Sequence, residues 1–220
     1  MTLKNSLAHL LILNYPVPAA LLAARIHPSL QLDTHGGTAW LSLLAFEQQR
    51  FAPLGRLGPS FNFPEVNYRT YVQWRQQRGV YFFRLDLGCA WLALISRMFF
   101  GMPCRTQPLD LQVEMEAGNT YRSWRLHSPE LVVAARSAGA AAADSAWFLE
   151  PNHGFFTHRN GSLRHFQVKR SRTGLMAARA TIARCNFLED IWGDRPAESP
   201  SASLIKGLKL ELVKFPPQPV

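Results

Sequence analysis

Residues 66–87, VNYRTYVQWRQQRGVYFFRLDL, decide the fold of this chain, because two segments rich in aromatic and β-branched residues flank a polar turn. Segments 66–74 and 79–87 have the composition of half-buried strands. The polar QQR at 76–78 is typical of the turn between such strands. The stretch therefore predicts an antiparallel hairpin and indicates a mainly β fold.

The rest of the chain repeats this pattern of strands and turns. Tight-turn pairs predict three further hairpins, at Gly36-Gly37, Gly118-Asn119 and Asn160-Gly161. Strands are also predicted at 109–116, 120–127, 130–137 and 208–215. Pro18 is expected to begin a short helix. Residues 89–100 are expected to form a second helix, which is apolar nearly all round and should be buried. The alanine-rich segment 137–150 is either a helix or a loop with a short helix. We predict one domain over residues 1–220, with two or three helices.

Composition narrows the class of protein. The chain of 220 residues is 47% hydrophobic and carries a formal net charge of +9, so a packed core is expected and disorder is not. Three cysteines, odd in number and far apart, point to a reducing compartment. The N-terminus lacks the features of a signal peptide, and no stretch is long and apolar enough to span a membrane. We expect a cytoplasmic protein.

The positive charge favours anionic partners. The basic residues are nevertheless spread along the chain, and the densest run, 159–172, alternates like an ordinary strand with a solvated face. No nucleic-acid-binding signature accompanies the charge, so nucleic-acid binding is the least favoured class of function.

Several residues carry chemistry that the sequence leaves open. Glu65 precedes an apolar strand, where desolvation would raise its pKa, or it pairs with Arg69. Cys104 beside Arg105 is either an activated thiol or a small buried side chain. The sequence has no glycine-rich phosphate loop and so predicts no cofactor. It predicts no metal either, although His158 and His165 are expected on one surface of a hairpin near His153, because further ligands are missing.

The quoted segments, together with LNYPVPAALLAARIHPSLQLD, NFPEVNYRTYV and SRMFFGMP, resemble the YqjF-like family of uncharacterised conserved bacterial proteins. That family is similar in fold to acetoacetate decarboxylase. The resemblance, strongest over about residues 10–105, implies a cone-shaped, incomplete antiparallel β-barrel around an apolar pocket. It also implies a small-molecule partner and, by analogy with the decarboxylases, a homo-oligomer.

The resemblance to the decarboxylase itself involves Tyr81, Arg97 and Pro103, after which Cys104-Arg105 stand in place of a lysine pair. One lysine of that pair forms a Schiff base in the decarboxylase, and a thiol cannot replace it in that role. Imine-forming decarboxylation is therefore not expected.

The resemblance implies an internal pocket for a small anionic or carbonyl-containing ligand. Glu65 would be its acid–base or hydrogen-bonding group, Arg97 and Arg105 would supply charge, and Tyr68 and Tyr81 would line the pocket. Arg97 has an alternative role, as a buried arginine paired with Asp86 or Glu65. Whether the pocket turns a ligand over as a lyase, isomerase or hydrolase, or only binds it, stays open.

Overall fold

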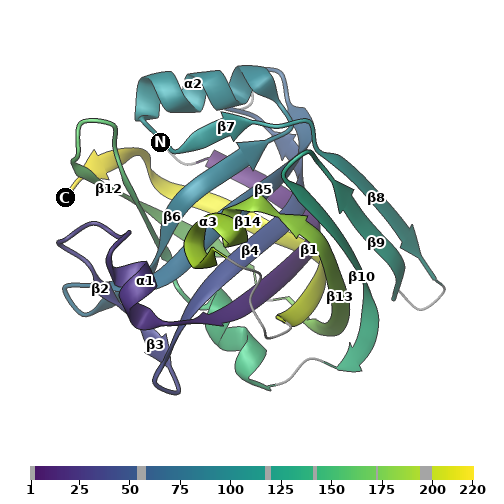
Figure 1. Cartoon of the computed structure of the whole chain (residues 1–220). Helices are drawn as coiled ribbons and strands as arrows, with labels where there is room; N and C mark the ends of the chain where they lie inside the picture. The colour runs from purple at the N-terminus through teal and green to yellow at the C-terminus, as the bar shows by residue number, and fades with distance from the viewer. Residues whose placement is uncertain (1–2, 54–57, 117–119, 141–142, 172, 194–199) are drawn as a thin grey trace.

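We describe a computed structural model of the chain, covering residues 3–53, 58–116, 120–140, 143–171, 173–193 and 200–220. Figure 1 shows long, strongly bent strands that wrap around an interior, with short helices at the periphery. The elements in chain order are β1 (Leu3–Val17), α1 (Ala19–Ala23), β2 (Gln31–Leu32), β3 (Thr34–His35), β4 (Thr38–Phe51), β5 (Phe61–Trp74), β6 (Gln77–Leu87), α2 (Ala90–Phe100), β7 (Cys104–Thr106), β8 (Asp110–Met115), β9 (Tyr121–His127), β10 (Leu131–Ala140), a 3₁₀ helix (Ala143–Leu149), β11 (His153–Thr157), β12 (Leu163–Arg170), β13 (Met176–Cys185), α3 (Asn186–Trp192) and β14 (Ser201–Pro219).

The strands of the described residues form one large sheet. Its order is β1-β4-β5-β6-β11-β12-β14-β13-β10-β9-β8, and β1 also pairs with β14, so the pairing returns to its first strand. Neighbours are antiparallel except at β6–β11 and β6–β7. Because β6 and β11 pair over only three residues, the sheet does not close into a regular barrel. The predicted mainly β fold with an incomplete barrel and two or three helices is confirmed.

The two faces of the bent sheet bury different cores. The outer face of β1, β4 and β5 packs against β9, β10 and α3, through side chains that include Leu13, Leu43, Trp124 and Leu188. Strands β8, β9 and β10 form the second layer of this core, and they project to the right in Figure 1. The inner face of the same strands surrounds a cavity.

A β-bulge decides which side chains of β6 reach this inner face. The pairing of β5 with β6 shifts between Tyr68–Arg84 and Arg69–Phe82, which leaves Phe83 as an extra residue. Successive side chains of a strand alternate between faces, and an extra residue reverses the alternation. Val80 and Phe82 therefore face inward before the bulge, and Leu85 and Leu87 do so after it.

Helix α2 corrects one prediction. It covers one end of the strands (Figure 1) and buries only Leu92 and Ala93. Its other face is open to solvent, with Trp91 49%, Leu94 45%, Met98 56% and Phe99 73% exposed. The expectation of a helix buried all round is wrong, because the sheet covers a single side of it. None of the helices in the described part of the chain has the length and apolarity needed to cross a membrane.

The turn predictions were largely right. Gly36 and Gly37, both with positive φ, join β3 to β4. The hairpin of β5 and β6 turns at Arg75 and Gln76, one position before the predicted QQR. Around Asn160-Gly161, the last pair of β11 and β12 is Thr157–Leu163, so the loop has five residues instead of two. The predicted turn at Gly118-Asn119 lies outside the described residues, but the strands that flank it pair as expected.

Four elements were not predicted in their full form. Strand β1 begins in the segment considered only as a possible leader, β13 and α3 follow the third hairpin, and β14 runs far beyond the expected 208–215. The alanine-rich segment 137–150 divides between the end of β10 and the 3₁₀ helix, so the single-helix alternative is wrong.

Candidate functional site

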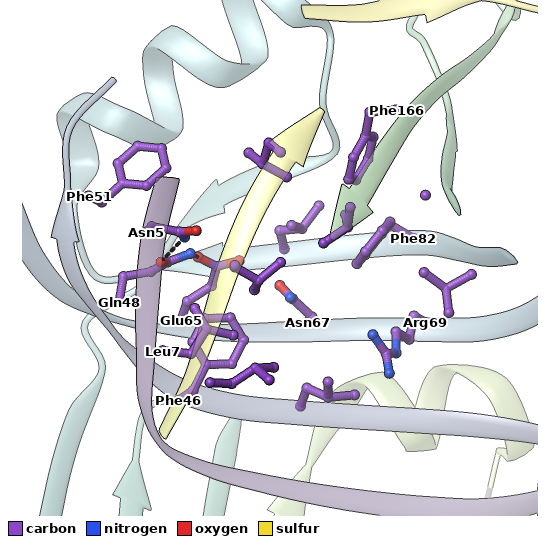
Figure 2. Close-up of a pocket in the computed structure, with 18 of the residues that line it drawn as sticks. Asn5, Leu7, Phe46, Gln48, Phe51, Glu65, Asn67, Arg69, Phe82 and Phe166 are labelled. Carbon is purple, nitrogen blue, oxygen red and sulfur yellow. Dashed lines mark hydrogen bonds between the residues drawn. The ribbon is translucent and has the colours of Figure 1, made fainter. Parts of the chain in front are cut away.

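The inner face of the sheet encloses a cavity of about 170 Å³. Strands β1, β4, β5, β6, β12 and β14 form its walls, and α2 closes it with Leu92 and Ser96. Most of the lining is apolar, with leucines and phenylalanines from every wall. The polar residues of the lining are few: Asn5, Gln48, Glu65, Asn67, Arg69, Ser96, Cys104, His153 and Arg170. Figure 2 shows Asn5, Gln48 and Glu65 clustered together, and Arg69 apart from them beyond Asn67.

Glu65 lies in this cavity and is only 6% exposed. Its Oε2 accepts a hydrogen bond from Gln48 Nε2 at 2.9 Å, and Gln48 Oε1 in turn accepts one from Asn5 Nδ2 at 2.6 Å. Desolvation raises the pKa of Glu65 to about 7, while hydrogen bonds from Gln48 and Asn67 act in the opposite direction. The carboxyl group can therefore both give and take a proton near neutral pH.

Two arginines share the cavity with Glu65. Arg69, 6% exposed, donates from Nη2 to the backbone oxygen of Phe148 at 2.9 Å, and its buried Nε has no hydrogen-bond partner. Arg170 donates to the backbone oxygen of Pro151. Desolvation and the charge of Arg69 lower the pKa of Arg170 to about 10, so Arg170 remains cationic at neutral pH.

Neither arginine has an acidic partner among the described residues. The alternative that paired Glu65 with Arg69 is therefore wrong. Both side chains face inward, but Glu65 and Arg69 are four residues apart along β5, which separates their Cα atoms by about 13 Å. Sequence reasoning missed Arg69 and Arg170 as a pair, because the two residues lie 101 positions apart in the chain, on different strands.

Cys104 and Arg105, which were expected to act together, face opposite ways along β7. Cys104 is buried in the cavity wall, where desolvation, together with the charge of Glu65, raises the pKa of its thiol far above the ordinary value. Arg105 points away from the cavity and binds Glu130 at 2.7 Å. The thiol therefore stays protonated. Of the two alternatives for Cys104, the small buried side chain fits this geometry, because a strand directs consecutive side chains to opposite faces and Arg105 points away.

Three other predicted site residues lie outside the cavity. Arg97 is exposed on α2, so the alternative that paired it with Asp86 or Glu65 is also wrong. Tyr68 faces the second core, where its ring packs against Phe187. Tyr81 also faces away from the cavity, and its hydroxyl lies 2.7 Å from Thr157 Oγ1. Of the six predicted residues, the cavity brings together Glu65 and Cys104.

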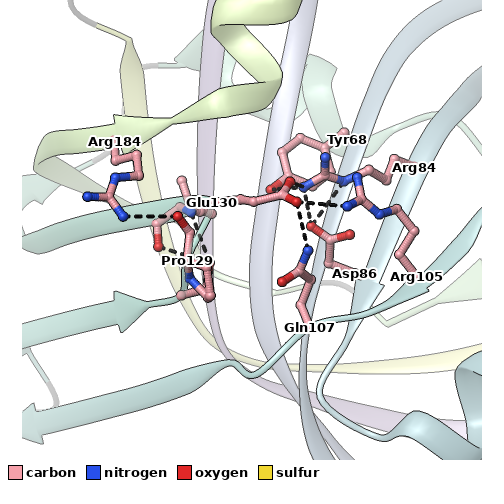
Figure 3. Close-up of polar contacts among 10 residues, drawn as sticks. Tyr68, Arg84, Asp86, Arg105, Gln107, Pro129, Glu130 and Arg184 are labelled. Carbon is pink, nitrogen blue, oxygen red and sulfur yellow. Dashed lines mark hydrogen bonds and ion pairs between the residues drawn. The ribbon is translucent and has the colours of Figure 1, made fainter.

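A network of charged side chains lies on the outer face of the sheet, next to the side chain of Tyr68. Arg84 binds Asp86 on its own strand and Glu130 in the turn between β9 and β10, at 2.5 and 2.8 Å. Arg105 and Gln107 both donate to Glu130 (Figure 3). Burial is the largest influence on Asp86 and raises its pKa although Arg84 favours the charged form, whereas the arginines outweigh burial at Glu130 and lower its pKa. This network joins the two layers of the fold.

The histidines do not meet as expected. His153 Nδ1 lies 2.7 Å from His165 Nε2, whereas His158 Nδ1 lies 2.7 Å from Asn160 Oδ1. The five-residue loop removes His158 from the face that was assumed for a two-residue turn. In the part of the chain that the structure describes, no group of three or more potential metal ligands is formed.

The protein family DUF2071, described as an uncharacterized conserved protein, matches residues 4–209. The uncharacterized protein YqjF of Bacillus subtilis (strain 168) is 37% identical over 94 residues, 41% of this chain and 38% of YqjF. The aligned part is thus well under half the length of that relative.

Solved structures share the fold at low sequence identity. The enduracididine biosynthesis enzyme MppR, in complex with pyruvate, superimposes with a TM-score of 0.71 at 10% identity over 99% of this chain and 90% of its own. Acetoacetate decarboxylase from Legionella pneumophila gives a TM-score of 0.68 at 14% identity, over 99% and 86% of the two chains. Likeness at this identity concerns the fold alone. The chain is therefore a member of the DUF2071 family of uncharacterized conserved proteins, and its fold is that of acetoacetate decarboxylase.

Proposed function

We propose that the cavity binds a small organic carboxylate, with the carboxylate group held by Arg69 and Arg170. The observation that carries this proposal is the pair of cationic guanidinium groups in a largely apolar cavity, without an acidic partner in the described residues. A buried cation is costly unless an anion or several hydrogen bonds compensate it. A bound carboxylate would accept from the free Nε of Arg69 and supply the missing charge.

The size and polarity of the cavity limit the ligand. An apolar protein cavity of roughly 150 Å³ holds benzene, so 170 Å³ fits an organic acid of comparable bulk. The apolar walls favour a ligand with a short hydrocarbon or aromatic body. The Asn5–Gln48–Glu65 cluster, away from the arginines (Figure 2), favours a carbonyl or hydroxyl group at the other end of the ligand.

The comparisons support a carboxylate ligand without naming it. MppR, which shares the fold, was solved with pyruvate, a 2-oxo acid. Among the described residues, no lysine lines the cavity of this chain, and Cys104 cannot form an imine. The proposal is therefore binding without a Schiff base.

A second candidate, acid–base turnover of the bound acid, is favoured by the state of Glu65. A general acid or base works best when its pKa is close to the working pH, and burial brings the pKa of Glu65 to about 7. In this alternative, Glu65 would transfer a proton to or from the carbonyl or hydroxyl end of the ligand. Glu65→Gln separates the two candidates, because it removes proton transfer but keeps the size and hydrogen bonding of the side chain.

A thermal-shift panel tests the proposal. Short 2-oxo acids, aliphatic acids and aromatic acids are compared with their amides, which have the same shape but no charge. A ligand at 100 times its Kd adds about 2.7 kcal/mol of apparent stability. We expect acids to stabilise the protein and amides not to, and we expect Arg69→Met to abolish the effect.

The matched control is Arg105→Met, which removes the same charge outside the cavity. Arg69→Met should remain folded, since it removes a buried charge that has no acidic partner in the described chain. Equal stabilisation by acids and amides, or a shift by acids that survives Arg69→Met, contradicts the proposal. A ligand that binds unchanged to Glu65→Gln but is converted only by the wild type selects the enzyme.

A further inference from the structure

The opposite face of the cavity wall carries a second hollow, of about 490 Å³, lined by β1, β4, β12 and β14. Alternation along the strands explains its composition. Asn5, Leu210 and Arg170 line the cavity, so their neighbours Lys4, Lys209 and Glu211, Lys169 and Ser171 face outward. The hollow shares Asn5, Arg170 and Leu210 with the cavity, but its three lysines line the hollow alone.

The register of the strands gathers lysines at this place. Lys4 pairs with Glu211, and Glu211 pairs with Lys169 on the other side. Lys209 lies opposite Ser6, in the next outward-facing row. Neighbouring strands are about 4.8 Å apart, so the three lysines come from strands spanning about 10 Å. Three lysines far apart in the sequence thus share one small surface.

The positive charge of the hollow is not neutralised. Its lining contains five cationic residues, Lys4, Arg50, Lys169, Arg170 and Lys209, against the single carboxylate of Glu211. No ion pair in the described residues involves any of the five. Lys4, Arg50, Lys169 and Lys209 are exposed, so an anion from solution reaches them directly.

The backbone holds Arg50 in an unfavourable conformation at this site. Its φ of 52° lies in the left-handed region, which costs energy for a residue with a Cβ. The conformation is held by a hydrogen bond from the Arg50 backbone nitrogen to Asn62 Oδ1 at 2.8 Å, at a bulge of β4. A glycine would relieve the strain, and backbone strain of this kind clusters at functional sites.

We propose that this hollow is a binding site for a small phosphate-bearing ligand, whose phosphate oxygens are held by Lys4, Lys169 and Lys209 with Arg50 at the rim. Phosphate groups match the site because several cations lie on adjacent strands around one hollow, and lysine and arginine are the usual partners of phosphate oxygens. The hydroxyl groups of Ser6 and Ser171 add neutral polar groups to the lining. Arg170 lines both sites, but Lys4, Lys169, Lys209 and Arg50 line only the hollow, so the phosphate proposal does not rest on the carboxylate proposed for the cavity.

Isothermal titration calorimetry with inorganic pyrophosphate tests the site. We expect one equivalent to bind at low ionic strength and the affinity to fall with added salt. Lys169→Met and Lys209→Met should each raise Kd about tenfold, the loss typical of one charge-assisted hydrogen bond. Lys206→Met is the matched control, because it removes the same charge from an exposed position of the same strand that does not line the hollow.

Arg50→Gly adds a second signature, because it should raise the thermal midpoint while weakening pyrophosphate binding. The proposal is overturned if pyrophosphate does not bind at millimolar concentration, or if Lys206→Met weakens it as much as Lys169→Met does. Binding of heparin or duplex DNA without pyrophosphate also overturns it, in favour of a nucleic-acid surface. The cavity proposal is separable, since Arg69→Met should leave pyrophosphate binding unchanged and Lys169→Met should leave carboxylate binding unchanged.

Discussion

At the scale of single residues, Glu65 shows how burial changes the chemistry of a side chain. The group is almost fully enclosed, and its hydrogen bonds come from the neutral amides of Gln48 and Asn67 instead of a cation. Neutral donors stabilise the carboxylate less than an arginine would, so the desolvation cost dominates.

This leads to a prediction about pH. The pKa of Glu65 rises from 4.5 in the unfolded chain to about 7 in the folded protein. The contribution of neutral Glu65 to stability is therefore complete below about pH 4.5 and is lost as the pH rises through 7. We expect the wild type to lose about 3 kcal/mol relative to Glu65→Gln between pH 4.5 and 8, measured by urea unfolding at each pH.

The control for this prediction is Glu114→Gln, which changes an exposed carboxyl group on β8. Its difference from the wild type should hardly vary with pH. A difference between wild type and Glu65→Gln that is constant from pH 4.5 to 8 would mean that Glu65 is ionised in the folded protein throughout.

At the scale of elements, the end of α2 depends on one glycine. Gly101 ends the helix with a φ of 62°, and a Cβ at this position would overlap the ring of His158 in the loop between β11 and β12. Gly161 has a φ of 84° but no atom within 4 Å of where a Cβ would lie. A side chain at Gly161 would therefore meet backbone strain alone, whereas one at Gly101 would meet both backbone strain and steric crowding.

Alanine substitutions measure both effects. Gly161→Ala should cost about 1 kcal/mol from left-handed strain alone. Gly101→Ala should cost about 1–3 kcal/mol more, because the new methyl group displaces the imidazole. Both are read from chemical denaturation, and the double variant Gly101→Ala/His158→Ala should return to the cost of Gly161→Ala. Equal costs for the two single variants would show that the loop gives way freely.

At the scale of the whole molecule, the charged network of Figure 3 links the inner strands to the second layer. Arg84 and Asp86 belong to β6, and Glu130 belongs to the turn between β9 and β10. Arg84 is 7% exposed and Asp86 is 2% exposed, and one oxygen of Asp86 has no hydrogen-bond partner. Removing one member leaves an uncompensated charge between the layers.

We therefore expect Arg84→Met to destabilise the protein by about 3–5 kcal/mol. The double variant Arg84→Met/Asp86→Leu should recover much of that loss, since paired apolar replacements avoid the desolvation cost. Urea unfolding gives both values, with Arg105→Ala as the control at the half-exposed rim of the same network, where about 1 kcal/mol or less is expected. A double variant as unstable as Arg84→Met would show that the ion pair is a net source of stability.

The sequence predicted correctly those strands and turns that depend on residues close to them in the chain. The hairpins at Gly36-Gly37 and Asn160-Gly161 follow from residues within a few positions of the turn. Strand β1 was missed because its sequence shows no strict alternation, and only its pairing with β4 and β14 makes it a strand. Its left-handed residue His9 marks the bulge that interrupts the alternation.

Some features of the candidate site could likewise be predicted from the sequence, and others could not. The absence of a lysine at Cys104-Arg105, and the apolar surroundings of Glu65, were visible in the sequence. The arginines of the cavity were not, because Arg69 and Arg170 meet only when β5 and β12 are brought to the same interior. Arg105, Tyr68 and Tyr81 were expected in the pocket but lie outside it, because the sequence does not show which face of each strand points inward.

The sequence by itself determined the mainly β composition, most turns and the absence of a lysine at 104–105, since these depend on local conformational preference and residue identity. Only the tertiary structure decided which side chains point into the cavity and which point away from it. A single bulge at Phe83 reverses the inward positions of β6, and the closure of β1 on β14 places three distant lysines on one surface. The physical reason is that cavities, charge pairs and desolvation are properties of contacts between strands, and such contacts are set by register and not by neighbouring residues in the chain.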